Sequence, residues 1–310
     1  MADPNAELQP LAGDASFRRY FRVRGEAGNR ILMDAPPPKE DVRPFLRVRE
    51  WLDEAGVRVP ALVGSEVLQG FLLLEDFGDI TWAVHLFDGG DVVPLFADAL
   101  RQLHALQSHL PVFALPLFDE ARMRAECNLY LDWYLPHVAC HTPSAEAREA
   151  FHAALAPLLW EIARLPRVPV HLDYHSRNLM LPDGCTPLGV IDFQDAVMGP
   201  VTYDPASLLY DCYQSYPERV RREWSRHFFE AMPRSLQEGF ADVEAWHRAV
   251  RLTALQRHIK AIGIFSRLAF RDGKRQFLQE IPLTRKHLRE EIGDLGMEEG
   301  LTPLLLMEPV

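Results

Sequence analysis

The sequence predicts an α+β fold with a small β-rich N-terminal lobe at residues 1–79 and a larger helical lobe at residues 80–310. Three observations predict it. Short alternating or apolar segments bounded by Gly and Pro dominate the first part, and helical apolar periodicity dominates the second. One short β insertion, at 168–192, interrupts the helical part. A chain of 310 residues is long enough for such a two-lobed domain.

The N-terminal lobe is predicted from strand and turn signals. Residues 17–23 alternate aromatic and β-branched side chains with arginines, which indicates an amphipathic strand, and 30–34 form the returning strand after a turn at 25–29. Residues 41–55 place their apolar side chains on one broad helical face. The apolar run at 71–74 indicates a further strand.

The C-terminal lobe is predicted to be mainly helical. Helical patterns cover the segments 92–107, 119–139, 145–165, 205–213, 217–231 and 242–270. The β insertion reads as short strands at 168–172, 178–181 and 188–192 around an Asp183-Gly184 turn. Polar residues at the ends of these strands are therefore candidates for a site.

Composition excludes several classes of protein. The formal net charge of −11 argues against a nucleic-acid partner. Neither a basic segment followed by an apolar run nor 18 consecutive apolar residues occurs, so we expect no secretory signal and no membrane span. The four cysteines lie far apart without a CxxC pair, which indicates reduced thiols in a cytoplasmic protein. Composition does not indicate an oligomeric state.

The strongest chemical signal is a spaced set of polar residues in the β insertion. His171 and Asp173 are followed by Asn178, and Asp192 ends the next apolar strand. Phosphoryl transfer needs a carboxylate to accept the proton of the attacking hydroxyl, and an amide and a second carboxylate to bind Mg²⁺. An ordinary hairpin would explain isolated Asp and Asn residues, but it does not explain this spacing.

At these residues the chain resembles the aminoglycoside phosphotransferase and choline kinase superfamily, relatives of protein kinases, over nearly its whole length. The resemblance implies a protein-kinase-like bilobal fold, with ATP as phosphoryl donor and Mg²⁺ as cofactor. It implies that Asp173 is the catalytic base, that Asn178 and Asp192 are metal ligands, and that His171 supports the loop. Asp204 opens a helix as an N-cap would, and the resemblance gives it a structural role in bracing that loop.

The same resemblance implies a nucleotide site in the N-terminal lobe. Gly13, Ser16 and Phe17 belong to the turn that would cover the phosphates, where Gly and Ser suit a tight turn with free amides. Glu75 and Phe77 lie where the family's hinge backbone would bind adenine. Taken alone, the first segment also fits a plain turn, and the second also fits an ordinary strand end with a turn.

One position departs from the family's pattern. The second strand of the family usually carries a Lys or Arg that meets the nucleotide phosphates, and Met33 takes that place here, within the nucleotide-binding set. The remaining candidates for neutralising phosphate charge are Arg18, Arg19, Arg22 and the metal. This departure leaves open a non-catalytic nucleotide-binding pseudokinase as an alternative of another class.

A narrower resemblance concerns the substrate, a small sugar. Four stretches are similar to the bacterial anomeric kinases of cell-wall recycling, which phosphorylate the C1 hydroxyl of N-acetylmuramate and N-acetylglucosamine: 13–22, 32–37, 172–180 and 256–265. The resemblance implies an ATP-dependent sugar kinase. Kinases for aminoglycosides or amino alcohols stay open as alternatives, and both would favour an acidic acceptor pocket.

Further residues are candidates for the acceptor site. Gln194 and Asp195 lie just past Asp192 and could face the sugar, although surface exposure explains them equally well. Arg257 and His258, on the helical segment 245–270, are candidate contacts for an acidic substrate. The alternative is a solvated basic helix face.

Overall fold

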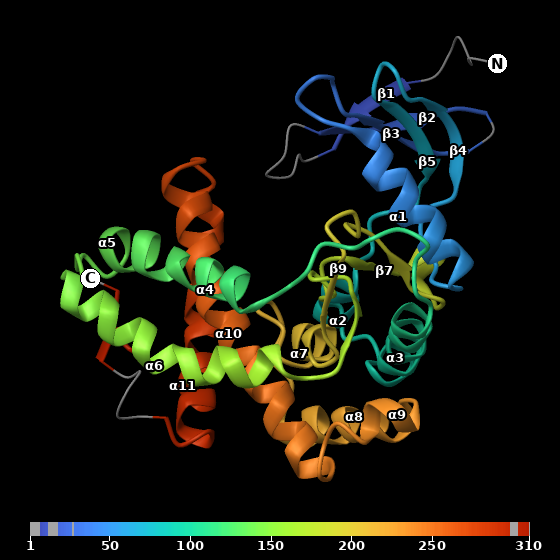
Figure 1. The fold of residues 1–310 in the computed structure, drawn as a ribbon. Coiled ribbons are helices and arrows are strands. Elements are labelled where there is room, and N and C mark those ends of the chain that lie inside the picture. Colours follow the sequence, from blue (N-terminus) through green and yellow to red (C-terminus); the bar gives the residue numbers. More distant parts are fainter. Residues whose placement is uncertain (1–6, 12–17, 27, 298–302, 310) are drawn as a thin grey trace. The chain divides into compact units, whose positions relative to one another are not determined.

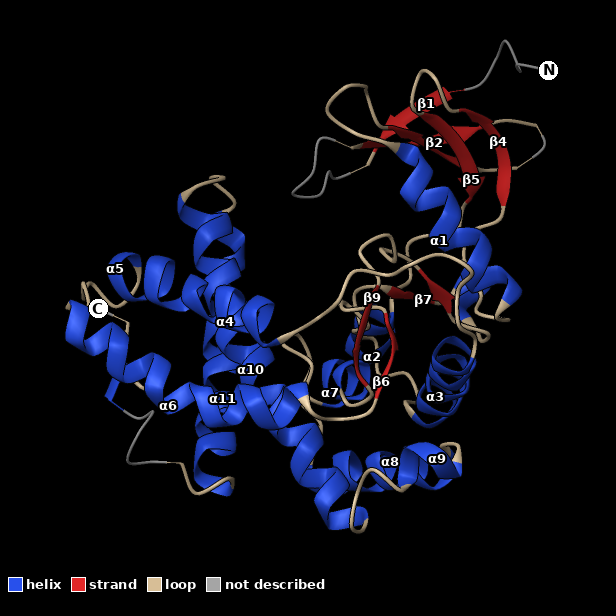
Figure 2. Ribbon diagram, viewed as in Figure 1, coloured by secondary structure: helices blue, strands red, loops and turns tan. Residues whose placement is uncertain are grey.

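The computed structural model describes residues 7–11, 18–26, 28–297 and 303–309, and it divides the chain into two units (Figures 1 and 2). The N-terminal unit comprises Met1–Pro111 with Arg177–Ala196, and the C-terminal unit comprises Val112–Ser176 with Val197–Val310. Within the described ranges, none of the helices has the length and apolar character needed to cross a membrane.

The N-terminal unit contains a five-stranded antiparallel sheet among its described residues, in the order β1-β2-β3-β5-β4. The strands are β1 (Glu7–Pro10), β2 (Arg19–Arg24), β3 (Arg30–Asp34), β4 (Leu62–Glu66) and β5 (Phe71–Glu75). The β2–β3 hairpin is the one that the alternating pattern predicts. Met33 of β3 lies opposite Tyr20 and Leu72, and Met33 and Leu72 have no exposed surface. Because side chains alternate along a strand, this register directs Met33 into the core.

Helices and a second hairpin complete the N-terminal unit. They are α1 (Val42–Glu54), α2 (Trp82–Phe87), α3 (Val93–Ser108), β7 (Leu179–Met180), the short 3-10 turn Pro182–Gly184 and β8 (Gly189–Val190). The amide of Gln102 on α3 donates to the carbonyl of Leu188 and its oxygen accepts from the N–H of Arg58, both at 2.8 Å. The rings of Phe45 and Phe193 lie 4.8 Å apart. These long-range contacts explain why the unit extends beyond the 1–79 boundary that the sequence suggested.

The C-terminal unit is built around the 28-residue helix α10 (Val243–Phe270). The other helices are α4 (Glu120–Leu129), the π-helical η1 (Tyr130–Tyr134), α5 (Leu135–His137), α6 (Ala145–Ala163), α7 (Tyr203–Leu209), α8 (Glu218–Ala231), α9 (Arg234–Gln237), η3 (Arg275–Glu280) and α11 (Ile281–Asp294). Strands β6 (Arg167–Val170) and β9 (Val197–Pro200) pair antiparallel. In Figure 1, α10 (orange) runs beside α4, α7 and α11, and it contacts all three. It is therefore covered on several sides.

The packing of α10 against α4 and η1 leaves no room for a side chain at Gly263. A Cβ atom there would lie 2.4 Å from the carbonyl carbon of Leu129 and 2.5 Å from the nitrogen of Tyr130. Because both are backbone atoms, the two helices would have to move apart.

We predict that Gly263→Ala lowers the free energy of unfolding by about 1–3 kcal/mol, the usual cost of overpacking a core. Urea unfolding followed by circular dichroism measures the change. Gly64→Ala on β4 is the control, because a Cβ atom added there would have no neighbour within 4 Å and its φ lies outside the left-handed region. Equal stability of Gly263→Ala and the wild type would contradict this reading of the interface.

Candidate functional site

In the C-terminal unit, the loop after β6 carries Asp173 and is fixed at its start by Asp204. The buried carboxylate of Asp204 accepts the backbone N–H of His171 at 2.8 Å and that of Leu172 at 3.1 Å. Leu172 has a left-handed φ of 80°, which is unusual for a residue with a branched side chain and persists only where neighbours enforce it. Asp204 thus holds the backbone that leads into Asp173.

The position of Asp204 in its helix differs from the expectation. Thr202 is the N-cap of α7, and Asp204 lies in the first turn, as the second residue of the helix. Its side chain accepts bonds from the loop that carries Asp173, not from its own helix N-terminus. The structural role is the one assigned from the resemblance, whereas the capping role is corrected.

A second aspartate, Asp211, fixes the other end of the loop. Its carboxylate has no exposed surface and accepts the N–H groups of Ser176 at 2.8 Å and Tyr213 at 2.7 Å. Sequence reasoning left Asp211 without a role. The only available signal was that two aspartates, Asp204 and Asp211, flank one short apolar helical segment.

Charges in the same unit keep Asp173 ionised. Burial raises the pKa of Asp173, but the nearby charges of Lys260, His175 and Arg257 outweigh burial and hold this pKa below its usual value. By contrast, burial raises the pKa of Asp204 to about 7 despite its two backbone hydrogen bonds. Of these two carboxylates, Asp173 is thus the better suited to accept a proton at neutral pH.

The predicted metal ligands lie together in the N-terminal unit. Asn178 immediately precedes β7 and Asp192 follows β8, and pairing of Leu179 with Val190 brings the two strand ends together. The amide nitrogen of Asn178 lies 3.4 Å from a carboxylate oxygen of Asp192. Asp192 has a left-handed φ of 63°, and such strained residues are concentrated at functional sites.

The donor set at Asn178 and Asp192 fits magnesium. Mg²⁺ prefers oxygen ligands and usually takes only one or two carboxylates, with waters and substrate phosphates completing its shell. Gln194 donates its amide to Asp192 at 2.9 Å, and to the exposed Asp195 at 3.5 Å. In this arrangement Gln194 orients the Asp192 carboxylate, while Asp195 remains accessible.

The proposed nucleotide residues are only partly described. Gly13, Ser16 and Phe17 lie outside the residues that the structure describes. The Glu75 N–H donates to the carbonyl of Ala61 at 2.9 Å, and the Glu75 carboxylate accepts from Arg58 at 2.9 Å. The guanidinium of Arg58 also lies 4.9 Å from the ring centroid of the buried Phe77. The side chains of Glu75 and Phe77, and the N–H of Glu75, are thus already used within the unit.

Met33 does not fit the role expected of it. Its side chain is 0% exposed in the core of the N-terminal unit, so it presents no surface to a nucleotide phosphate. The structure therefore removes Met33 from the nucleotide-binding set. The arginines considered in its place all form ion pairs within the unit: Arg18 with Glu40, Arg19 with Asp34, and Arg22 with Asp76 and Asp79.

His258 is also corrected from an acceptor contact to a structural residue. Its side chain is fully buried; Nδ1 lies 2.9 Å from a carboxylate oxygen of Glu291, and Nε2 donates to the carbonyl of Tyr210 at 2.8 Å. Burial lowers the pKa of His258, but the Glu291 carboxylate raises it to about 10. The protonated ring uses both nitrogens to link α10 to α11 and to the end of α7.

Arg257 remains a candidate for binding an anion. It is 7% exposed, which excludes a solvated basic face at this position, and its guanidinium lies 5.3 Å from the ring centroid of Tyr203. Among the described residues, Nε and Nη1 of Arg257 have no hydrogen-bond partner. A buried guanidinium with free donors is costly unless a ligand satisfies it.

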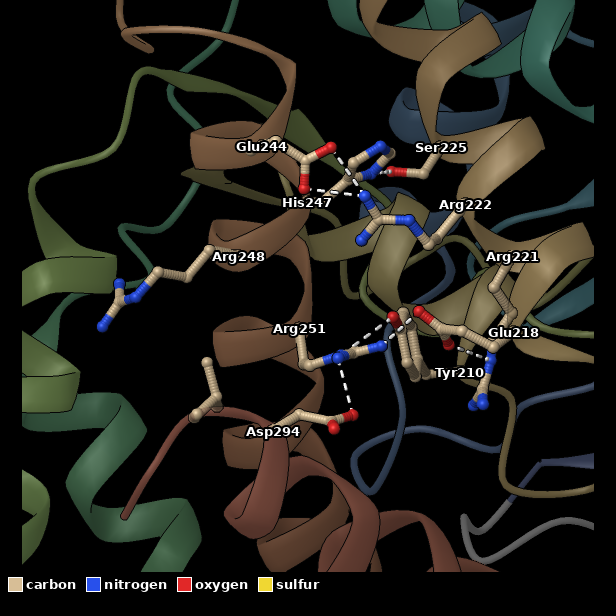
Figure 3. Close-up of a pocket in the computed structure, with 11 residues that line it drawn as sticks. Tyr210, Glu218, Arg221, Arg222, Ser225, Glu244, His247, Arg248, Arg251 and Asp294 are labelled. Carbon is tan, nitrogen blue, oxygen red and sulfur yellow. Dashed lines mark hydrogen bonds and ion pairs between the residues drawn. The ribbon is translucent and has the colours of Figure 1, made fainter.

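A cavity of about 190 Å³ lies elsewhere in the C-terminal unit, between α8, α10 and α11 (Figure 3). Ion pairs cross it: Arg222 binds Glu244 at 2.6 Å, and Arg251 binds Asp294 at 2.6 Å and also Glu218. The cations of this cavity are already neutralised by neighbouring carboxylates. None of its lining residues was predicted for the nucleotide, metal or acceptor, and we assign it no ligand.

Comparisons with known proteins identify the family. The model of the phosphotransferase enzyme family matches residues 7–238. The chain belongs to this family. An N-acetylmuramate/N-acetylglucosamine kinase of Pseudomonas aeruginosa is 40% identical over 304 residues, which cover 94% of this chain and 88% of that protein. A kinase of the same name from Neisseria meningitidis serogroup B is 33% identical, over 96% of this chain and 94% of that protein.

Solved structures show the same fold at low sequence identity. A choline/ethanolamine kinase family protein from Mesorhizobium loti is 15% identical with a TM-score of 0.65, over 97% of this chain and 93% of that one. An ADP-bound aminoglycoside phosphotransferase is 15% identical with a TM-score of 0.55, over 92% and 94%. These structures confirm the predicted protein-kinase-like fold, and the family match confirms the predicted phosphotransferase class.

Proposed function

We propose that this phosphotransferase uses ATP and Mg²⁺ to phosphorylate the anomeric C1 hydroxyl of N-acetylmuramate and N-acetylglucosamine. The observation that carries the proposal is the 40% identity, over 94% of the chain, to a kinase named for these two sugars. A reaction that uses ATP on sugars recovered from the cell wall fits a cytoplasmic enzyme. No observation favours an aminoglycoside, an amino alcohol or a non-catalytic role.

Asp173 is the proposed general base. The proton of the C1 hydroxyl passes to its carboxylate while the hydroxyl oxygen forms a bond to the γ-phosphorus of ATP. The bond from that phosphorus to the β–γ bridging oxygen breaks, and ADP leaves. Because an anomeric hydroxyl is more acidic than an ordinary alcohol, a carboxylate of low pKa is a sufficient base. The loose transition state makes positioning of the hydroxyl the main task of Asp173.

Asn178 and Asp192 would hold Mg²⁺, which, when bound, neutralises charge on the nucleotide phosphates. We retain Gly13, Ser16 and Phe17 as the proposed phosphate-covering turn, and the backbone of Glu75 and Phe77 as the proposed adenine contact. Met33 lies in the core, and among the described residues the arginines considered in its place are all paired with carboxylates. The metal and the turn amides then carry the phosphate charge.

The proposal is tested on the purified wild-type protein with ATP and Mg²⁺. N-acetylmuramate, N-acetylglucosamine, kanamycin and choline are offered separately, and ³¹P NMR identifies the product. We expect sugar 1-phosphates from the first two acceptors and no turnover once EDTA removes the metal. Phosphorylation of kanamycin or choline alone would overturn the sugar assignment and leave only the family.

Asp173→Asn preserves the shape of the base but removes its ability to accept a proton. We predict a loss of kcat of about 10²-fold or more, as is usual for removal of a general base, while ATP binding measured by calorimetry is retained. Asp183→Asn, in the exposed turn of the same insertion, is the control and should keep wild-type kcat. Near-normal turnover of Asp173→Asn would remove this residue from the mechanism.

Arg257 is the proposed contact for the lactyl carboxylate, which N-acetylmuramate carries and N-acetylglucosamine lacks. A charge-assisted hydrogen bond contributes about 1.5–3 kcal/mol. We therefore predict that Arg257→Ala lowers kcat/KM for N-acetylmuramate about tenfold or more and leaves N-acetylglucosamine within about twofold. Arg248→Ala, on the same helix and paired with Glu161, is the control. Equal losses on both sugars would mean that Arg257 supports the loop and does not bind the acceptor.

A further inference from the structure

Arg22 ties strand β2 of the N-terminal unit to the segment that follows β5. Its Nε and Nη2 donate to the two carboxylate oxygens of Asp76 at 2.6 and 3.1 Å. Its Nη1 and Nη2 also donate to the two oxygens of Asp79 at 2.9 and 2.8 Å. Because β3 lies between β2 and β5 in the sheet, the guanidinium reaches across a whole strand to make these bonds.

This cluster is more than a surface ion pair. The side chains of Arg22 and Asp76 are 8% and 5% exposed, whereas Asp79 is largely exposed. Surface ion pairs contribute little, but a planar guanidinium that binds a carboxylate through two nitrogens fixes its direction as well as its distance. Arg22 therefore fixes the geometry of the segment from Asp76 to Asp79.

The segment that Arg22 holds includes the proposed adenine contact. Asp76 lies between Glu75 and Phe77, whose backbone is proposed to bind the base. The carboxylate of Asp76 also accepts the N–H of Gly78 at 2.9 Å, and Gly78 has a left-handed φ of 79°. Because glycine loses more conformational freedom than any other residue when it is fixed, the turn at Gly78 needs such a partner to keep one conformation.

The β7–β8 hairpin fixes the same segment from another side. The ring of Phe77 lies against Gly189 of β8, where an added Cβ atom would be 2.3 Å from the ring. The N–H of Leu181 donates to the carbonyl of Ile80 at 2.7 Å. The segment is thus held between Arg22 on β2 and the hairpin that carries the proposed metal ligands.

We propose that Arg22 is a positioning residue for the nucleotide base. By binding Asp76 and Asp79, it keeps the backbone on either side of Asp76 in the conformation that receives adenine. The inference rests on the proposed adenine contact. Groups that are already ordered bind more tightly, because the ligand does not have to order them. One arginine with two aspartates leaves an excess negative charge, which disfavours a phosphate at this place, so Arg22 acts on the base.

Two other roles for Arg22 predict different results. If Arg22 binds the phosphates of ATP, its loss weakens the binding of any polyphosphate. If it only stabilises the sheet, its loss lowers the melting temperature but leaves the nucleotide affinity of the folded protein unchanged. The affinities for adenosine and for inorganic tripolyphosphate separate the base from the phosphates, so together they distinguish the three roles.

The experiment compares Arg22→Met with the wild type. Dissociation constants of ATP, adenosine and tripolyphosphate are measured with Mg²⁺ present, by competition with an ATP analogue that carries a fluorescent label on the ribose. We expect ATP and adenosine to bind about five- to tenfold more weakly, the loss of about one hydrogen bond, and tripolyphosphate to stay within about twofold. The KM for ATP should rise to the same extent, while kcat at saturating ATP stays near that of the wild type.

Two further substitutions serve as comparisons. Arg22→Lys keeps the charge but not the planar fork, so it should not restore adenosine binding; full restoration would assign the effect to charge alone and overturn the proposal. Arg49→Met is the control and should bind all three ligands like the wild type. Arg49 lies on α1 of the same unit, is 11% exposed in its side chain and pairs with the exposed Asp53.

A double variant covers the case in which an unpaired, buried Asp76 disturbs the fold. Arg22→Met with Asp76→Asn removes both buried charges and keeps a side-chain oxygen for the N–H of Gly78, and a melting curve checks that it folds. A selective loss of adenosine affinity in the folded variants supports the proposal. Wild-type adenosine affinity in either folded variant, or equal losses for adenosine and tripolyphosphate, overturns it.

Failure of the proposed function looks different, because these binding measurements need no acceptor. If the wild type binds adenosine but phosphorylates neither sugar, only the substrate assignment fails, and the comparison of the variants still decides the role of Arg22. If the wild type does not bind adenosine, the adenine contact and the role of Arg22 are both wrong.

Discussion

The Asp204 carboxylate accepts the N–H groups of His171 and Leu172, and the loop that carries Asp173 depends on this pair of hydrogen bonds. Both donors are buried, and a buried N–H without a partner costs about 1–3 kcal/mol. The left-handed turn at Leu172 gives Asp173 its direction and is not favourable by itself. At the far end of the loop, the Asp211 carboxylate likewise accepts a backbone N–H, that of Ser176. Asp204 in α7 and Asp211, two residues past the end of α7, thus hold the two ends of the loop.

Helix α10 contributes both to the packing of the C-terminal unit and to its buried positive charge. It is the helix that most others of the unit contact, and it also carries Arg257 and Lys260. These cations offset carboxylates that the loop needs but that the interior alone would disfavour. The ring centroid of Tyr203 lies 5.3 Å from the Arg257 guanidinium and 5.8 Å from the Lys260 ammonium. Packing and charge balance are therefore satisfied by the same helix, and substitutions in it affect both.

Local patterns predicted the fold class, and the spacing of Asp173 and Asn178 indicated the candidate site. Both inferences depend on residues close in sequence. What they missed depends on contacts between distant segments. Met33 was placed on the correct strand, but only pairing with neighbouring strands shows that it faces the core. His258 looked accessible because an apolar stripe implies a solvated opposite face, and α10 has neighbours there too. Asp211 binds a backbone N–H 35 residues away, which leaves no sequence signature.

The N-terminal unit is assembled from two separate stretches of chain, Met1–Pro111 and Arg177–Ala196. Two side chains of α3 bind the backbone of Leu188. The amide of Gln102 donates to the Leu188 carbonyl at 2.8 Å, and the carboxylate of Asp98 accepts the Leu188 N–H at 2.7 Å. During synthesis, which proceeds from the N-terminus, these side chains stay without those partners until the second stretch has left the ribosome. The sheet can form early, but the hairpin that carries the proposed metal ligands joins it late. The unit therefore completes its folding only after Val112–Ser176 of the C-terminal unit has been translated.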